Sequence, residues 1–253
     1  MHRYSIPRIL LLLLCTLSFS LQAQEASALF KEAEALEKKF KDEEALDKYK
    51  AVIRQEPKNI RALCKISELY NIIGKRIPEK DKQHEYYKKG VEYARAALKV
   101  NANYAEANFA MAISMGRMAL IASGEEKIKA VKEIKRYADR CIQIDPTNYK
   151  GYHVLGKWHY EVSDLSSLER WLVKVSYGAL PASSIDESIK FYEKSKSLSP
   201  GFLLNYLELA KAYQRKKDKK KARRLLEELE KLPPSSADDP KIKSMGRKLL
   251  NEL

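Results

Sequence analysis

Glycine and proline are scarce in this chain, with 9 residues of each among 253. β-Sheets need turn glycines and many β-branched residues, so the shortage disfavours them and suits amphipathic helices. Cysteine occurs only 3 times, which excludes a disulfide framework. Motifs for a nucleophile elbow, a phosphate-binding loop, a zinc-binding cysteine pair and a zinc-protease helix are also missing. The sequence therefore predicts no catalytic residue, no metal site and no cofactor.

Acidic residues are outnumbered by basic ones, 34 to 48, and the formal net charge is +14. Such an excess favours attraction to anionic surfaces, peptides or polymers through long-range steering. No nucleic-acid reading motif accompanies it, so we expect no nucleic-acid partner. One stretch, 214–224, is especially basic; it fits either a solvated helix corner or a contact with an anionic membrane.

The first 23 residues have the pattern of a secretory signal peptide. Arg3 and Arg8 precede an apolar run, Ile9 to Leu21, and Ala23 offers a small residue for cleavage. The run is shorter than the ~20 residues that span a bilayer, although an uncleaved anchor is the alternative. We expect an exported chain, located in the periplasm or cell envelope after cleavage near Ala23. Without Arg3 and Arg8 its net charge falls from +14 to +12.

A recurring helix end divides residues 24–253 into repeats. The equivalent turn positions are Pro57, Ala102, Pro146, Pro200 and Pro234, spaced by 45, 44, 54 and 34 residues. Proline stops one helix and suits the start of the next. The spacing of 34 equals the tetratricopeptide period, and the middle units are longer.

Small residues flanked by large ones recur inside each unit, which lets paired helices approach closely. Examples are Ala33, Ser67, Ala112, Gly156 and Ala210 in the first helices. The pattern predicts an all-α fold: a right-handed α-solenoid of about five tetratricopeptide-like hairpins. The closing segment "DDPKIKSMGRKLLNEL" predicts a C-terminal capping helix.

The middle repeats carry extra residues between their two helices. In the second unit these are "KRIPEKDKQH", where Pro78 breaks the helix, and the third unit has longer helices. The fourth holds "LSSLERWLVKVSYGALP", enough for an additional helix, before a helix capped by Ser184. We expect Trp158 and Trp171 to anchor this insertion and the pair Glu169–Arg170 to tie it to the body.

The fourth unit resembles the regulator of microtubule dynamics protein family. The matching residues are Leu155-Gly156-Lys157-Trp158, Tyr160-Glu161-Val162, Leu168-Glu169-Arg170, Pro181 and Pro200-Gly201-Phe202. The resemblance spans roughly residues 26–232 and departs at His159 and Ser188. It implies a tetratricopeptide scaffold, with members on membranes or at contacts between them, some of them linked to phospholipid binding.

In such arrays certain positions of each first helix line a concave groove, which we expect to have a basic rim and an apolar floor. The candidate ligand-binding residues are Asn71, Phe109, Ile113, Arg117, Lys150, His153, Lys157, Tyr160, Leu207, Lys211 and Arg215; Glu68, Ile72 and Leu204 share the same positions. This groove would suit a protein or peptide partner. An anionic phospholipid is the alternative ligand. A third possibility is that the inserted segments fold into the groove and cover its apolar floor.

Overall fold

The computed structural model describes residues 24–253, where all regular secondary structure is helical. The proposed signal peptide, 1–23, lies outside the described residues. Residues 24–38 form the first helix. The others are α2 (Asp42–Gln55), α3 (Ile60–Arg76), α4 (Lys80–Val100), α5 (Ala105–Ile121), α6 (Gly124–Ile144), α7 (Tyr149–Ser163), α8 (Ser167–Tyr177), α9 (Ile185–Leu198), α10 (Leu203–Arg215), α11 (Lys219–Lys231) and α12 (Asp239–Asn251). Within the described range, no helix is both long and apolar enough to cross a membrane.

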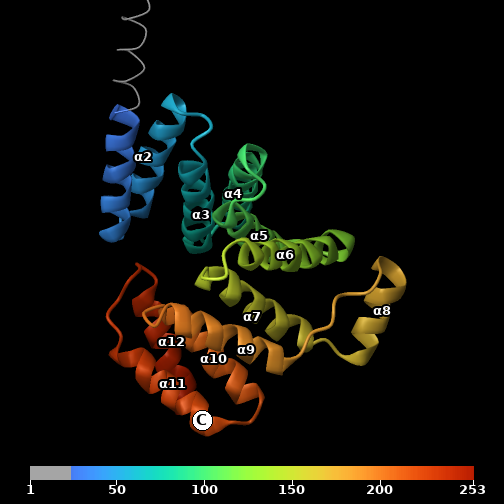
Figure 1. Cartoon of the computed structure of the whole chain (residues 1–253). Helices are drawn as coiled ribbons and strands as arrows, with labels where there is room; N and C mark the ends of the chain where they lie inside the picture. Colours follow the sequence, from blue (N-terminus) through green and yellow to red (C-terminus); the bar gives the residue numbers. More distant parts are fainter. Residues whose placement is uncertain (1–23) are drawn as a thin grey trace, which may run out of the picture.

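The helices of residues 24–253 pair into five antiparallel hairpins, which confirms the predicted α-solenoid (Figure 1). Helix 24–38 packs on α2, where the rings of Phe30 and Tyr49 meet with centroids 5.1 Å apart. The next pairs are α3 with α4, α5 with α6, α7 with α9, and α10 with α11. The predicted capping helix is α12, which packs against both α10 and α11.

Local capping residues fix where the helices begin. The side chains of Asn59 and Asn148 accept hydrogen bonds from the backbone N–H groups three residues later, at 3.0 and 3.1 Å. Ser184 and Asp218 cap α9 and α11 in the same way. These caps satisfy N–H groups that have no partner inside the helix. The hairpin boundaries are therefore set by the turn sequences.

Small residues set the distance between paired helices. A Cβ on Gly156 would lie 2.6 Å from the ring of Tyr192, so only glycine lets α7 and α9 approach this closely. The Ser188 hydroxyl donates to the Gly156 carbonyl oxygen at 2.8 Å. Ser67 makes the equivalent bond to the Gly90 carbonyl oxygen in the second hairpin, also at 2.8 Å. The predicted small positions are thus helix–helix contacts.

The extra residues of the middle repeats mostly lengthen helices. In the second unit, Pro78 lies in a short connection and "KDKQH" forms the first turns of α4, so most of the expected inserted loop is helix. In the third unit the longer helices are as predicted. The fourth unit contains the predicted additional helix, α8.

The residues expected to anchor α8 behave differently from one another. Trp158 is buried, and its Nε1 donates to the Val131 carbonyl oxygen at 2.8 Å. Trp171 is 58% exposed, so its predicted anchoring role is wrong. Arg170 does tie α8 to the body, donating to the carbonyl oxygen of Val162 at 2.6 Å. Glu169 instead caps its own helix.

Successive first helices lie side by side, because α3 contacts α5, α5 contacts α7, and α7 contacts α10. We call the surface formed by helix 24–38, α3, α5, α7 and α10 the inner face. The inserted helix α8 packs on α6, a second helix, and therefore does not cover this face.

The solenoid curves until its last helix meets its second hairpin (Figure 1). Asp238, at the N-cap of α12, accepts from Lys75 Nζ at 2.6 Å and from Arg76 Nε at 2.9 Å. Arg76 also donates to Asp42 Oδ2 at 2.6 Å. These side chains join residues 163 positions apart in sequence. We call this cluster the end contact.

Breaking the end contact, by acid or by mutation, should change the shape of the protein. Burial would raise the pKa of Asp238, but hydrogen bonds from Lys75 and Arg76 outweigh it and hold the pKa below the ordinary 3.8. Stabilisation from this carboxylate is therefore complete above pH 3.8 and is lost as the pH falls through the lower folded-state pKa. Asp238→Asn should increase the radius of gyration in small-angle X-ray scattering and lower Tm by about 2–4 °C.

The matched control is Asp186→Asn, which removes a carboxylate paired with Lys216 on the surface of the C-terminal hairpins. It should leave the radius of gyration unchanged. An equal expansion in both variants would show that Asp238 does not hold the two ends together.

Candidate functional site

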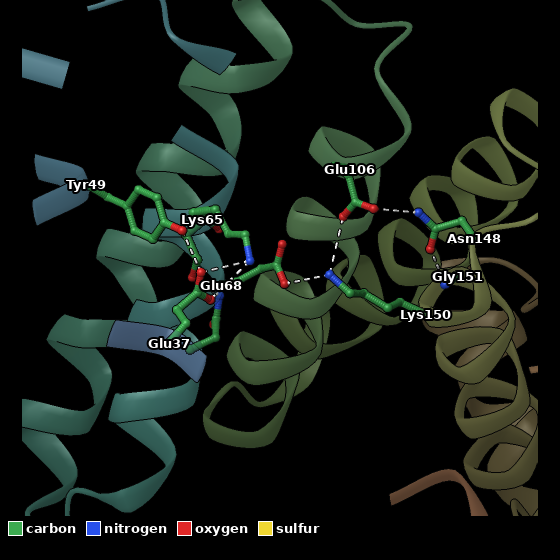
Figure 2. Close-up of polar contacts among 10 residues, drawn as sticks. Glu37, Tyr49, Lys65, Glu68, Glu106, Asn148, Lys150 and Gly151 are labelled. Carbon is green, nitrogen blue, oxygen red and sulfur yellow. Dashed lines mark hydrogen bonds and ion pairs between the residues drawn. The ribbon is translucent and has the colours of Figure 1, made fainter. Parts of the chain in front are cut away.

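The centre of the inner face is an ion-paired lysine shared by three hairpins. Lys150 of α7 lies 2.9 Å from Glu68 of α3 and 3.5 Å from Glu106 of α5 (Figure 2). Its ammonium also lies 4.9 Å from the ring centroid of Phe109. Burial alone would lower the pKa of Lys150, but the two carboxylates raise it above the ordinary value. Lys150 therefore stays charged and links the hairpins.

A buried carboxylate organises the C-terminal part of the face. Glu208 of α10 is 6% exposed and accepts from Lys157 at 2.8 Å and from Lys211 at 2.7 Å. Burial would raise the pKa of Glu208, yet the two lysines hold it below the ordinary range. The carboxylate thus remains ionised between α7 and α10.

Arg215 and Tyr160 form the last contact of the inner face. The guanidinium carbon of Arg215 lies 3.4 Å from the Tyr160 ring centroid, and Nη1 donates to the Tyr160 carbonyl oxygen at 2.6 Å. Asp164 lies 3.5 Å from the same nitrogen. The cation is therefore stacked and hydrogen-bonded as well as paired.

At the N-terminal end of the inner face, a carboxylate again accepts hydrogen bonds from two side chains. Glu37 accepts from the Tyr49 hydroxyl at 2.5 Å and from Lys65 Nζ at 3.0 Å, as Figure 2 shows. Burial and this carboxylate raise the pKa of Tyr49, so the hydroxyl stays a donor. Cations thus lie beside carboxylates at this end of the face as well.

The basic rim expected from sequence is therefore corrected to a charge-balanced surface. Lys150, Lys157, Lys211 and Arg215 all have carboxylate partners, supplied by a different helix in most cases. Sequence reasoning included Glu68 but missed Glu106 and Glu208. The sequence did contain a signal for Glu208. It precedes Lys211 by three residues, about one helical turn, so the two side chains are neighbours on the helix surface.

The apolar floor is also less open than expected. Phe109 is 6% exposed and Leu207 is fully buried. Ile113 is half-buried and packs in the cluster around Phe109, while Tyr160 lies beneath Arg215. The floor residues are in place, but charged side chains and close packing cover much of them.

Two predicted groove residues, the buried Asn71 and the half-buried His153, bond to neighbouring helices. Asn71 is fully buried; its amide donates to Ser114 Oγ at 2.8 Å, between α3 and α5, so its assignment to the groove is wrong. His153 Nδ1 lies 3.0 Å from Asn205 Oδ1, and burial lowers the pKa of this imidazole. Both residues hold helices together.

Arg117 differs from the other predicted cations. Its Nε is buried and has no hydrogen-bond partner within residues 24–253. Burial lowers the pKa of Arg117, and the nearby Tyr87 and Asp238 offset this only in part. This guanidinium therefore lies near the end contact without a strong partner.

A second concavity, missed in the sequence, lies between α4 and α6. Its volume is about 730 Å³. Met111, Met115 and Met118 of α5 line its floor, and its rims include Arg95 of α4 and Glu133 of α6. The i, i+4, i+7 spacing of the methionines is a signal for one apolar helix face.

Comparisons with known proteins identify the family of this chain. The family model described as Regulator of microtubule dynamics protein 1-3 matches residues 29–253. Regulator of microtubule dynamics protein 1 of Bos taurus is 27% identical over 173 residues, covering 68% of this chain and 54% of the relative. Protein 3 of Rattus norvegicus is 26% identical over 192 residues, covering 76% and 40%. The chain therefore spans about half the length of these relatives, or less.

Two solved structures share the fold at low sequence identity. A thermophilic TPR protein of Thermus thermophilus superimposes with a TM-score of 0.67 at 9% identity, covering 88% of this chain and 99% of that one. Pseudomonas aeruginosa pilF gives 0.56 at 12% identity, covering 91% and 86%. At these identities the likeness shows the tetratricopeptide solenoid alone.

The buried position of Glu208 predicts strong coupling to Lys157. In a double-mutant cycle with Glu208→Gln and Lys157→Met, urea unfolding should give a coupling free energy of about 1–2 kcal/mol. The exposed pair Lys89–Glu92 is the control, and the coupling in its cycle should be indistinguishable from zero, because water screens the two charges. Equal coupling in the two cycles would show that the inner-face pair is only a surface contact.

Proposed function

The chain belongs to the Regulator of microtubule dynamics protein 1-3 family, and from this premise we propose a non-enzymatic scaffold that binds a protein or peptide on its inner face at the cell envelope. The tetratricopeptide fold supports the general role, since such solenoids form extended concave binding surfaces. The observation that carries the finer proposal is the row of ion pairs across α3, α5, α7 and α10, in which the lysines stay partly exposed.

The ligand chemistry follows from the cations that stay accessible. Lys211 and Arg215 expose 26% and 27% of their side chains and lie one turn apart on α10. Each already has a carboxylate neighbour, but ammonium and guanidinium groups have further donors. Acidic side chains of a peptide, spaced by about one helical turn, would add charge-assisted hydrogen bonds at these two positions.

An anionic phospholipid in the same groove is the alternative ligand. Acyl chains need a continuous open apolar surface, whereas Phe109 and Leu207 are covered by neighbouring side chains. The paired charges of the inner face suit a peptide better, because a peptide offers polar groups along its whole length.

Location at the cell envelope rests on the N-terminal pattern. The basic residues, the apolar run and the small residue at Ala23 support export with cleavage near that position. N-terminal sequencing of the protein isolated from its own cells tests this proposal: a start near Gln24 supports it, and a start at Met1 contradicts it.

The peptide proposal predicts a local effect of charge removal. Lys211→Gln with Arg215→Gln should weaken binding of an acidic peptide, selected against the wild-type chain, about tenfold, or about 1.4 kcal/mol. Fluorescence anisotropy measures the Kd. Neutral glutamine is preferable to glutamate here, because a new carboxylate would face Glu208 and destabilise the fold.

The matched control is Lys219→Gln with Arg223→Gln on α11, which removes the same charge at the same spacing from an outer helix. Its Kd should change less than about twofold if the effect is local rather than long-range. Equal weakening in both variants would mean that net charge, not the inner face, binds the peptide.

Native mass spectrometry separates the two ligand classes. The protein is purified gently from its own cell envelope. A bound mass that extracts into organic solvent favours the phospholipid, and a bound polypeptide favours the scaffold.

A further inference from the structure

Helix α8 presents its apolar side to solvent. It has no buried residue. Leu168 and Val175 are each 66% exposed, Trp171 is 58% exposed, and Leu172 is also exposed. In a helix of 3.6 residues per turn, these four positions share one side. The usual orientation, with the apolar side toward the core, is reversed.

The opposite side of α8 holds it against the body. Arg170 is half-buried and donates to backbone oxygens, including that of Val162. Lys132 of α6 donates to the Tyr177 carbonyl oxygen at 2.7 Å. Arg170, Val173 and Tyr177 are three or four residues apart, so they lie on a common side away from Trp171. The outward direction of the apolar side is therefore fixed.

The helix ends are built for a stable orientation. Ser166 and Glu169 form a reciprocal capping box at the N-terminus. At the C-terminus, Gly178 has a φ of 76°, a conformation that favours glycine. These local contacts stabilise α8 although its apolar residues are not packed in a core.

A second exposed apolar segment adjoins α8. Leu120 is 70% exposed and Ile121 is 37% exposed, at the end of α5. The turn that follows reaches α8, because a Cβ on Gly124 would lie 3.8 Å from the Tyr177 hydroxyl. We call α8 together with Leu120 and Ile121 the apolar corner. In Figure 1, α8 lies at the edge of the molecule.

We propose that the apolar corner docks on an anionic lipid bilayer surface. Its residues project from a helix at the edge of the molecule, and a flat, deformable lipid surface can receive them without a shaped pocket. Trp171, on the outward side, combines an apolar ring with a polar N–H group, which suits the water–lipid interface. An amphipathic helix lying in that interface buries such an apolar side among the headgroups.

Charge complementarity selects a bilayer with anionic headgroups. Lys127 and Lys129 are exposed on the first turns of α6 and Lys174 is exposed on α8, while Lys132 of α6 contacts α8 directly. The nearby carboxylate of Glu169 is occupied by its capping hydrogen bonds. Glu125 and Glu126 partly offset the lysines, but the whole chain carries +14. Basic residues near an amphipathic helix strengthen its attraction to anionic lipid.

This docking does not depend on what binds the inner face. The apolar corner consists of α8, which packs on the second helix α6, and of the last two residues of α5, so the ion-paired residues of the inner face lie outside it. The protein would thus be placed on a membrane surface by one part and bind its partner with another.

The test uses the fluorescence of Trp171 in the full-length chain. The sequence contains two tryptophans, and Trp158 is already buried. On addition of vesicles made of phosphatidylglycerol and phosphatidylcholine in equal parts, the emission should shift to shorter wavelength. Lipids with a doxyl group near the headgroup should quench it. Vesicles of phosphatidylcholine alone should give at least tenfold weaker binding.

The decisive variant is Leu168→Ser with Leu172→Ser and Val175→Ser, which keeps the reporter Trp171. It should weaken the vesicle-induced shift at least tenfold without changing Tm, because none of the three residues is buried. The control is Val100→Ser with Met245→Ser, two exposed apolar residues on other helices, which should bind like wild type.

Three results would overturn the proposal: no spectral shift with wild type, an unchanged shift in the triple variant, or equal weakening in the control. Analytical ultracentrifugation tests whether a second copy of the chain, rather than lipid, binds the apolar corner. A wild-type dimer that the triple variant dissociates would assign the apolar corner to a second copy of the chain.

Discussion

The close approach of paired helices is the constraint on which the remaining structure depends. Gly156 faces the Tyr192 ring with no room for a side chain, and Ser188 bonds across the same gap. The second hairpin makes the equivalent hydrogen bond, from the Ser67 hydroxyl to the Gly90 carbonyl oxygen, with the serine now on the first helix. Because the helices within these hairpins pack closely, the hairpins stack on one another and their first helices form one surface. The stacking then brings Lys150 to Glu68, 82 positions away in the sequence.

Features set by neighbouring residues could be predicted from the sequence, and those set by stacking could not. Turn prolines, caps and small residues act within a few positions, so the hairpins and the extra helix were found. The partners of the inner-face lysines come from other repeats, and a repeat pattern does not show them. Asn71 was misplaced because one residue turns a helix by about 100°, enough to move a side chain from the surface to the interior. Trp171 was misplaced because large aromatic residues usually pack, and α8 is reversed.

Charge pairing changes what the inner face can recognise. A bare row of lysines would attract any anion, whereas a row of pairs has little net field at a distance. A partner gains only where its own charges fit the remaining donors of Lys211 and Arg215 in position and direction. Long-range attraction must then come from the basic excess on the outside of the solenoid. Steering and selection are thereby assigned to different surfaces.

The end contact limits how far the inner face can open. Asp238 joins α12 to the end of α3, so the curvature of the whole array is held at both ends as well as by each hairpin. A partner too wide for the closed curve must break these bonds and separate Asp238 from Lys75 and Arg76. Arg117, a half-buried residue near this contact, would then lose a nearby carboxylate. Opening therefore costs the closing bonds and removes a carboxylate from the neighbourhood of Arg117, so the end contact favours the closed curve.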